Sequence, residues 1–411
     1  MTPHTLFIIL LIIVIAGFLF DQWINYLNTT TRSTVLPQAL KGFYDEDTYR
    51  RQQEYEAANY SFRLVSDIIS SLVIILALFL GGFAWLDSLV RVYTDSAIFQ
   101  ALLFFGLLAF ASDLLSTPFD LYHTFVIEER FGFNKTSPLT FILDKLKGWL
   151  LAAFIGGGIL ALIVYIYEKS GSWFWILAWV FISAATLFLS FFYTTLLVPV
   201  FNKLKPLPPG ELRDAIEHIA ALADFSLKNI SIMDGSKRST HGNAYFSGFG
   251  RKKSIVLFDT LINEHSTDEL AAVLAHEIGH YKKKHVLKGL ITGILQTGGL
   301  LFLLSLFLKS PLPALALGAS YSTFHMAIIA FGILYSPVSM VLGIFLNKLS
   351  RKHEYEADRF AVSLSKPGAL QDALKRLSVS NLSNLTPHPW YAFVHYSHPA
   401  LLQRLAAINN S

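Results

Sequence analysis

The sequence predicts an α-helical integral membrane protein, on three observations. The 411-residue chain is 53% hydrophobic, and its mean hydropathy is +0.47. Only 15% of its residues are charged, whereas about a quarter is usual in soluble domains. Several apolar runs also reach roughly twenty residues, the length that a helix needs to cross the hydrocarbon core.

Seven apolar runs qualify as spanning helices. The first follows only Met-Thr-Pro-His, with no basic stretch before it and no evident cleavage site, so we expect it to be kept as an anchor. The predicted spans are Leu6–Tyr26, Leu64–Trp85, Ala97–Leu115, Gly148–Tyr167, Trp173–Val200, Val286–Leu308 and His325–Phe345.

The loops between these runs alternate in charge. Basic residues gather in the first, third and fifth loops and in the tail after the last run, whereas the second, fourth and sixth loops hold only Arg91, Lys169 and Lys309. The positive-inside rule then places the N-terminus outside and the tail in the cytoplasm. Because the basic residues follow the membrane edges, we expect the lipid bilayer and no nucleic acid as a partner.

The chain divides into four predicted regions. Residues 1–201 hold five spans, residues 202–286 form a soluble insertion, residues 287–346 hold two spans, and residues 347–411 form a C-terminal part. The insertion is expected to contain a helix over Glu211–Ala223 and then a small sheet. The predicted strands are Asn229–Met233, Asn243–Phe249 and Ser254–Phe258, with a glycine-basic turn before the last. A strand beside a metal site could bind an extended peptide at its edge.

The insertion ends in H-E-x-x-H, at His276, Glu277 and His280. A helix is predicted here independently, because Ser266 followed by Glu269 forms a capping box before a helix-forming run. Positions i and i+4 share one face of a helix, so both imidazoles can reach one metal ion. The carboxylate of Glu277, one residue along, can then reach the other groups bound to that ion. The pattern is typical of zinc hydrolases, and two ordinary surface histidines are the alternative.

A zinc ion here needs a third protein ligand. The chain has no cysteine, so only nitrogen and oxygen ligands are available. Glu354, just after the last span, is favoured, while Glu356 and His353 on other faces of the same helix stay open as alternatives. Asp358 lies one turn beyond Glu354 and could accept the free N–H of a ligating histidine. Glu356 points elsewhere, and we expect it to be dispensable.

Polar or small residues interrupt the apolar runs at Asp67, Asp113, Gln296 and Gly156–Gly158. Close helix packing is the simpler interpretation, and a water-filled cavity is the alternative. The acidic pair Glu128 and Glu129 lies far from any partner in the chain, so a structural role is expected.

Several segments in order resemble the M48 zinc metalloproteases, in particular the Ste24-type CAAX prenyl proteases. H-E-I-G-H is followed by S-R-x-x-E-Y-x-A-D, and the likeness extends to Thr124-Phe-Val-Ile-Glu-Glu, Asp234-Gly-Ser-Lys-Arg-Ser-Thr-His-Gly and His395-Tyr-Ser-His-Pro. The resemblance implies seven helices around a water-filled intramembrane chamber. It also implies site residues: zinc ligands His276, His280 and Glu354, the catalytic base Glu277, Asp358 behind the ligands, and substrate contacts at Asn243, Ala244, His398 and Arg404.

The sequence and the resemblance together predict a membrane zinc endopeptidase with one zinc per chain and a thermolysin-like site on the cytoplasmic side. His398 or Arg404 is expected to help stabilise the oxyanion of the reaction. Substrates are expected to be peptides or proteins, including prenylated CAAX C-termini and membrane proteins in a quality-control role. A short sixth loop and the C-terminus Ala-Ile-Asn-Asn-Ser, which lacks a dilysine signal, favour a bacterial inner membrane. A chaperone or transporter with a structural zinc is the alternative.

Overall fold

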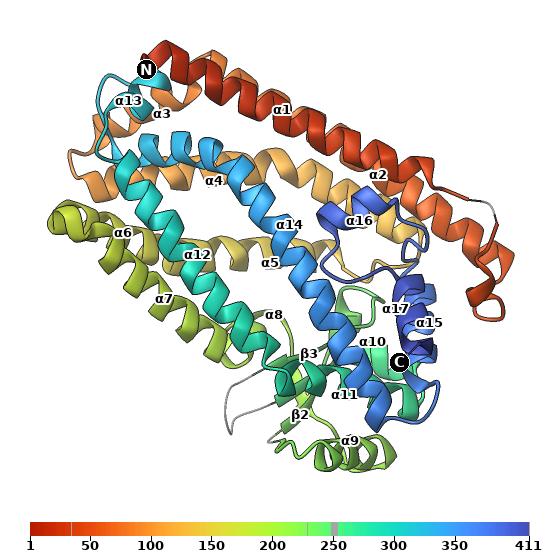
Figure 1. The fold of residues 1–411 in the computed structure, drawn as a ribbon. Coiled ribbons are helices and arrows are strands. Elements are labelled where there is room, and N and C mark those ends of the chain that lie inside the picture. The colour runs from red at the N-terminus through yellow and green to blue at the C-terminus, as the bar shows by residue number, and fades with distance from the viewer. Residues whose placement is uncertain (34, 228, 248–253, 411) are drawn as a thin grey trace.

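Long helices run beside one another through most of the molecule, and a small sheet with several short helices lies at one end (Figure 1). The computed structural model describes residues 1–33, 35–227, 229–247 and 254–410. The N-terminus lies at the end away from the sheet, whereas the C-terminus lies among the short helices (Figure 1). The predicted, mainly α-helical membrane architecture with a small sheet is confirmed at this level.

The first half of the chain supplies the membrane-type helices. Their bounds are α1 Pro3–Thr30, α2 Glu46–Phe79, α3 Gly82–Tyr93, α4 Ala97–Tyr122, α5 Pro138–Leu151, α6 Gly157–Ser170, α7 Phe174–Phe192 and α8 Val198–Phe201. Short 3₁₀ turns lie at Gln38–Leu40 and Gly171–Trp173, and π-helical turns at His123–Glu128, Ala152–Gly156 and Tyr193–Leu197.

The second half combines short helices with two long ones, α12 and α14. Their bounds are α9 Glu211–Leu222, α10 Asp259–Glu264, α11 Thr267–Lys282, α12 His285–Phe307, α13 Leu312–Ala316, α14 Phe324–Leu364, α15 Ala369–Ser380, α16 Pro389–His395 and α17 Leu401–Asn409. A 3₁₀ turn spans Gly235–Lys237.

Six helical stretches within the described ranges are long and apolar enough to cross a membrane, so the predicted count of seven is not confirmed. The difference lies in one stretch, Pro138–Phe201, which contains both the fourth and the fifth predicted span. A 3₁₀ turn joins α6 to α7 there, and Gly171 adopts φ +52°, which glycine tolerates without the clash that a side chain would cause. The rings of Tyr167 and Phe174 then meet 5.4 Å apart across the turn.

The four-stranded sheet has the order β1-β2-β4-β3. Its strands are β1 Leu204–Pro206, β2 Asn229–Met233, β3 Ala244–Ser247 and β4 Ser254–Phe258. β2 and β4 are parallel with Ile230 opposite Ile255, and β3 lies antiparallel to β4 with Ala244 opposite Leu257. The strands predicted at Asn229–Met233 and Ser254–Phe258 are present with those bounds. The end of the predicted Asn243–Phe249 strand and the glycine-basic turn lie outside the described residues.

Helix α11 is the centre of the soluble part. Leu270 and Leu274 pack toward the sheet residues Ile255 and Leu257, in a cluster of almost fully buried side chains. Its other side belongs to a second cluster that includes Ala361 of α14. α11 therefore lies between the sheet and the C-terminal part of α14, the last long helix (Figure 1).

Glu128 connects the membrane helices to the soluble part. Its carboxylate accepts a hydrogen bond from the Tyr55 hydroxyl of α2 at 2.6 Å and lies 3.4 Å from Nε2 of His241, which precedes β3. The ring of Phe133 stacks on His241 with centroids 4.2 Å apart. These contacts fit the structural role expected for this acidic residue.

Candidate functional site

The helix that carries H-E-x-x-H begins as the sequence predicts. The Ser266 hydroxyl accepts from the Glu269 backbone N–H, and the Glu269 side chain accepts from the Ser266 N–H, so both halves of the capping box are formed. Helix α11 then continues to Lys282, which places His276 and His280 one turn apart on one face. The two imidazoles face each other, with their Nε2 atoms 3.1 Å apart.

Helix α14 supplies the carboxylates opposite these histidines. It runs unbroken from Phe324 to Leu364, so Glu354 lies beyond the apolar part of the same helix. Gly279 allows the close approach of α11, because a Cβ atom there would lie 3.1 Å from the Cα of Ala357. Sequence reasoning missed this glycine, although it lies inside the motif.

His276, His280 and Glu354 form the group suited to a metal within the described chain, with one ligand atom from each lying within 4.8 Å of the others. Nε2 of His276 lies 3.5 Å from Oε2 of Glu354, and Nε2 of His280 lies 3.2 Å from Oε1. The predicted alternatives Glu356 and His353 contact His285 instead of this group.

The donor set fits a zinc ion. Oε2 of Glu354 is buried and makes no hydrogen bond to any described group, although Nδ1 of His398 lies 2.9 Å away in a geometry unsuited to one. A buried carboxylate oxygen without a donor is costly unless a cation satisfies it. Two imidazole nitrogens and one carboxylate oxygen are the ligands of many catalytic zinc sites, which keep a further position open.

Asp358 lies behind His276, where the sequence places it. Its Oδ1 atom is 2.8 Å from Nδ1 of His276, which leaves the Nε2 atom of that ring for a metal. Burial lowers the pKa of His276, but Asp358 and Glu354 outweigh burial and raise it to about 9. The two carboxylates therefore favour positive charge at the position where a cation would bind.

Arg404 of α17 is held mainly by Asp358. Its Nε and Nη2 atoms donate to the two carboxylate oxygens at 2.9 and 2.5 Å, and its Nη1 atom lies 3.7 Å from Oε2 of Glu354. A guanidinium in this paired arrangement is fixed in position. The structure thus brings Arg404 to the site, with two of its five N–H donors bound to Asp358.

Glu277 and His398 lie on the accessible side of the site. The Glu277 side chain is half-buried and makes no hydrogen bond to a described residue, so its carboxylate is available as a base. His398 is 66% exposed in the loop before α17 and reaches Glu354. It lines a pocket of about 380 Å³ together with Arg404, Leu377 and Asn381.

Asn243 and Ala244 lie at the start of the edge strand β3. The Asn243 carbonyl accepts from the Phe258 N–H at 3.0 Å, and its side chain is exposed. No contact joins either residue to the His–His–Glu group in the described part of the chain. Phe246 of the same strand packs in the cluster that contains Ala272 and Ala275 of α11, so the strand lies against the motif helix.

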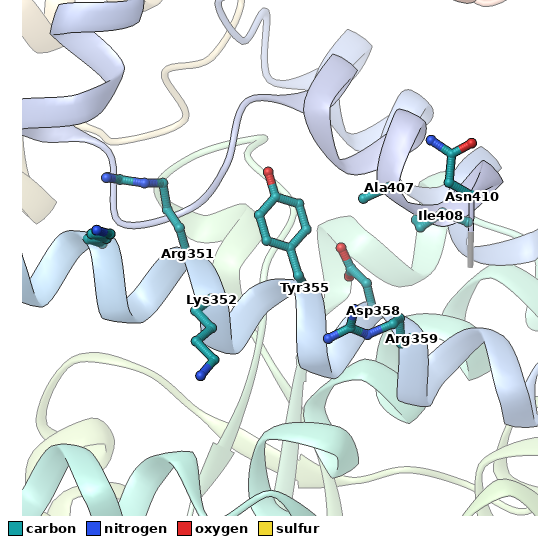
Figure 2. A pocket seen from close by; sticks show the side chains of 9 residues that line it. Arg351, Lys352, Tyr355, Asp358, Arg359, Ala407, Ile408 and Asn410 are labelled. Atoms are coloured by element: carbon teal, nitrogen blue, oxygen red, sulfur yellow. The ribbon is translucent and has the colours of Figure 1, made fainter.

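A second pocket, of about 570 Å³, lies beside α14 and α17 (Figure 2). In Figure 2, Tyr355 and Asp358 rise from α14 toward Ala407 and Ile408 of α17. Four basic side chains line it as well: Lys348, Arg351, Lys352 and Arg359. Asp358 therefore separates the candidate metal position from a basic pocket.

Sequence reasoning also missed His285, which begins α12. Its Nδ1 atom lies 3.2 Å from Nδ1 of His280, and its side chain is almost fully buried. A third histidine five residues after the motif was the available signal.

Two family models match the chain. Residues 25–203 match the CAAX prenyl protease N-terminal region with five membrane helices, and residues 206–411 match peptidase family M48. The CAAX prenyl protease 1 homolog of Arabidopsis thaliana is 34% identical, with 96% of each chain covered. CAAX prenyl protease 1 of Saccharomyces cerevisiae is also 34% identical, covering 96% of this chain and 93% of the yeast protein.

A solved structure is similar over nearly the whole chain. The crystal structure of S. mikatae Ste24p has a TM-score of 0.92 and 33% sequence identity. The match covers 98% of this chain and 99% of that one. Fold and sequence therefore point to the same set of relatives.

Proposed function

The chain belongs to the M48 peptidase family and is a membrane zinc metalloprotease similar to CAAX prenyl protease 1, and from this premise we propose that its His–His–Glu group is the catalytic centre. The observation that carries the proposal is the meeting of His276, His280 and Glu354 within 4.8 Å, beside the uncommitted carboxylate of Glu277. We propose one zinc per chain, held by these three residues.

Each neighbouring residue then has a task. A zinc ion held by His276, His280 and Glu354 would supply Lewis-acid chemistry, polarising the scissile carbonyl and making water at the site more acidic. Glu277 takes the proton of the attacking water and passes it to the leaving amine. Asp358 keeps the proton of His276 on Nδ1, and Arg404 holds Asp358 in place. His398, exposed beside Glu354, donates to the developing oxyanion.

The substrate is proposed to be an extended peptide segment. β3 is an edge strand that packs against α11, so a substrate backbone can pair with it near Asn243 and Ala244. The pocket of about 380 Å³ beside His398 offers room for a substrate side chain. Prenylated CAAX C-termini are proposed among the substrates because the relatives are named for them. Unprenylated segments of membrane proteins, in a quality-control role, are proposed as well.

The test is cleavage of two matched peptides by the purified protein in detergent. A prenylated CAAX peptide and its unprenylated form are incubated with and without chelator, and products are identified by mass. We expect cleavage of both peptides and its loss with chelator. Cleavage of the prenylated peptide alone would contradict the broader role, and cleavage of neither by zinc-loaded protein would favour the chaperone or transporter alternative.

We propose that the chain crosses the membrane seven times, with the turn at Gly171 separating two crossings, and encloses a water-filled chamber. Polar contacts among the spanning helices support this proposal. Lys145 of α5 donates to Asp113 of α4 at 2.9 Å, and Gln22 of α1 donates to Asp67 of α2 at 3.0 Å. Charged and polar groups at membrane depth usually face a bundle interior or a water-filled cavity.

The chamber predicts the reactivity of introduced thiols. Cysteine at Asp67 or Asp113 is expected to react with a small membrane-impermeant thiol reagent, because water reaches both positions. Ala101→Cys is the matched control, since Ala101 lies in the same helix as Asp113 and is 0% exposed. The chain has no native cysteine, so the mass of the labelled protein reports each site alone. Protection of both Asp67→Cys and Asp113→Cys would show a packed bundle instead.

The proposed orientation puts the site in the cytoplasm and the N-terminus outside, in a bacterial inner membrane. Lys348, Arg351, Lys352 and Arg359 follow the last apolar stretch on the side of the catalytic residues, which agrees with the positive-inside rule. The four regions 1–201, 202–286, 287–346 and 347–411 are kept as the proposed division. The family boundary between residues 203 and 206 supports the first of these limits.

A further inference from the structure

The hydrogen bonds around His280 continue beyond the metal ligands to His285 and Glu356. Nδ1 of His285 lies 3.2 Å from Nδ1 of His280, and Nε2 of His285 lies 3.0 Å from Oε2 of Glu356. The side chain of His285 is only 3% exposed, and the ring of His353 stacks on it with centroids 3.9 Å apart. These contacts fix both the plane and the position of the His285 ring.

The direction of this chain of hydrogen bonds follows from its last member. An ionised carboxylate only accepts, so Nε2 of His285 carries the proton that is donated to Glu356. A neutral imidazole has one N–H, which leaves Nδ1 of His285 as an acceptor. His280 must then donate its Nδ1–H to His285. The Nε2 atom of His280 keeps its lone pair and faces the other ligands.

The backbone supports a fixed place for His285. Lys284, between α11 and α12, adopts φ +58°, a left-handed conformation that is unfavourable for a residue with a side chain. This residue separates α11 from α12, and His285 directly after it contacts His280 in the last turn of α11. Such conformations persist where surrounding contacts determine them.

We propose that His285 and Glu356 are positioning residues that set the tautomer and the orientation of His280 as an Nε2 metal ligand. Asp358 sets the tautomer of His276 through direct contact with that ring. Glu356 acts on His280 indirectly, because it binds His285, which in turn accepts a hydrogen bond from His280. The proposal rests on the proposed zinc site. It also replaces the expectation that Glu356 is dispensable, because Glu356 lies outside the ligand group but touches the residue behind His280.

Zinc retention tests the proposal without use of activity. Wild type and variants are dialysed against graded chelator, and the zinc remaining per chain is measured. His285→Leu removes the acceptor and is expected to weaken zinc binding by about 10–100-fold, the usual effect of losing a partner of a ligating histidine. His285→Asn is expected to stay near wild type, because its amide oxygen can accept from His280 in place of Nδ1.

Glu356 provides an independent pair of variants. Glu356→Ala is expected to lose zinc more readily than wild type but less readily than His285→Leu, whereas Glu356→Gln keeps an acceptor and should resemble wild type. The double variant His285→Leu with Glu356→Ala should be no worse than His285→Leu alone, since Glu356 acts through His285. Lys352→Ala is the control, because Lys352 is 72% exposed and lies 3.9 Å from the other oxygen of Glu356.

The Co²⁺-substituted protein gives a second readout. The visible spectrum of the metal should change in His285→Leu and Glu356→Ala and be restored in His285→Asn and Glu356→Gln. Wild-type zinc retention in both His285→Leu and Glu356→Ala would overturn the proposal. If His285→Leu does not fold, equal zinc retention by Glu356→Ala and Glu356→Gln overturns it. Wild-type protein that binds no zinc, or a Glu354→Ala variant that keeps it, would instead contradict the proposed catalytic centre.

Discussion

Replacing Glu277 by glutamine is expected to lower kcat for peptide hydrolysis by about 100- to 10 000-fold, the usual contribution of a general base. Glutamine has nearly the same shape but cannot take the proton of the attacking water. Because Glu277 is not part of the His276, His280 and Glu354 group, the variant should keep one zinc per chain. Zinc content and turnover are measured on the same preparation.

The matched control is Glu217→Gln, on the exposed face of α9. Glu217 is 52% exposed and, among the described residues, forms an ion pair with Arg213 one turn away, so its loss should change neither zinc content nor turnover. A Glu277→Gln protein that loses zinc together with activity would make Glu277 a ligand. A variant with wild-type turnover would remove it from the proposed chemistry.

Elements set by local sequence could be predicted well. The capping box of Ser266 and Glu269 starts α11 where the sequence places it, and the alternating runs 229–233 and 254–258 are strands with the expected bounds. These features depend on neighbours in the chain. The number of spans depended instead on one turn. At Gly171 a short 3₁₀ turn joins two apolar helices with no loop between them, so counting apolar runs gives two spans and counting helical stretches gives one.

The site was predictable only where one helix contains the spacing. His276 and His280 follow from a four-residue interval in one helix. Glu354 belongs to a helix far along the chain, which also carries the carboxylates of Glu356 and Asp358, and residue type alone does not tell which of the three binds the metal. The close approach at Gly279 and Ala357 selects the face that carries Glu354 and Asp358. The turn at Lys284 brings His285 back to His280, and no local pattern specifies that contact.

The choice among the carboxylates of α14 predicts an order of zinc loss. Glu354→Ala removes a proposed metal ligand outright, so the affinity of this variant for zinc should fall by more than the roughly 10–100-fold typical of losing a residue that hydrogen-bonds to a ligand. Asp358→Ala removes the acceptor of His276, so the loss of zinc affinity in this variant should lie within that range. Glu356→Ala affects His280 only through His285, so this variant should lose less zinc affinity than Asp358→Ala. The measurement is metal content after dialysis against graded chelator.

Asp358 needs a second variant, because its loss also releases Arg404. That guanidinium is 11% exposed and lies 3.7 Å from Oε2 of Glu354, so without Asp358 its charge would oppose a zinc ion on the same oxygen. Asp358→Asn with Arg404→Leu removes both charges while keeping an acceptor for His276. We expect this double variant to retain zinc better than Asp358→Ala.

The order of zinc loss among the single variants decides the ligand set. If Glu356→Ala loses zinc before Glu354→Ala, the proposed ligand set is wrong, because no arrangement with Glu354 as ligand gives that order.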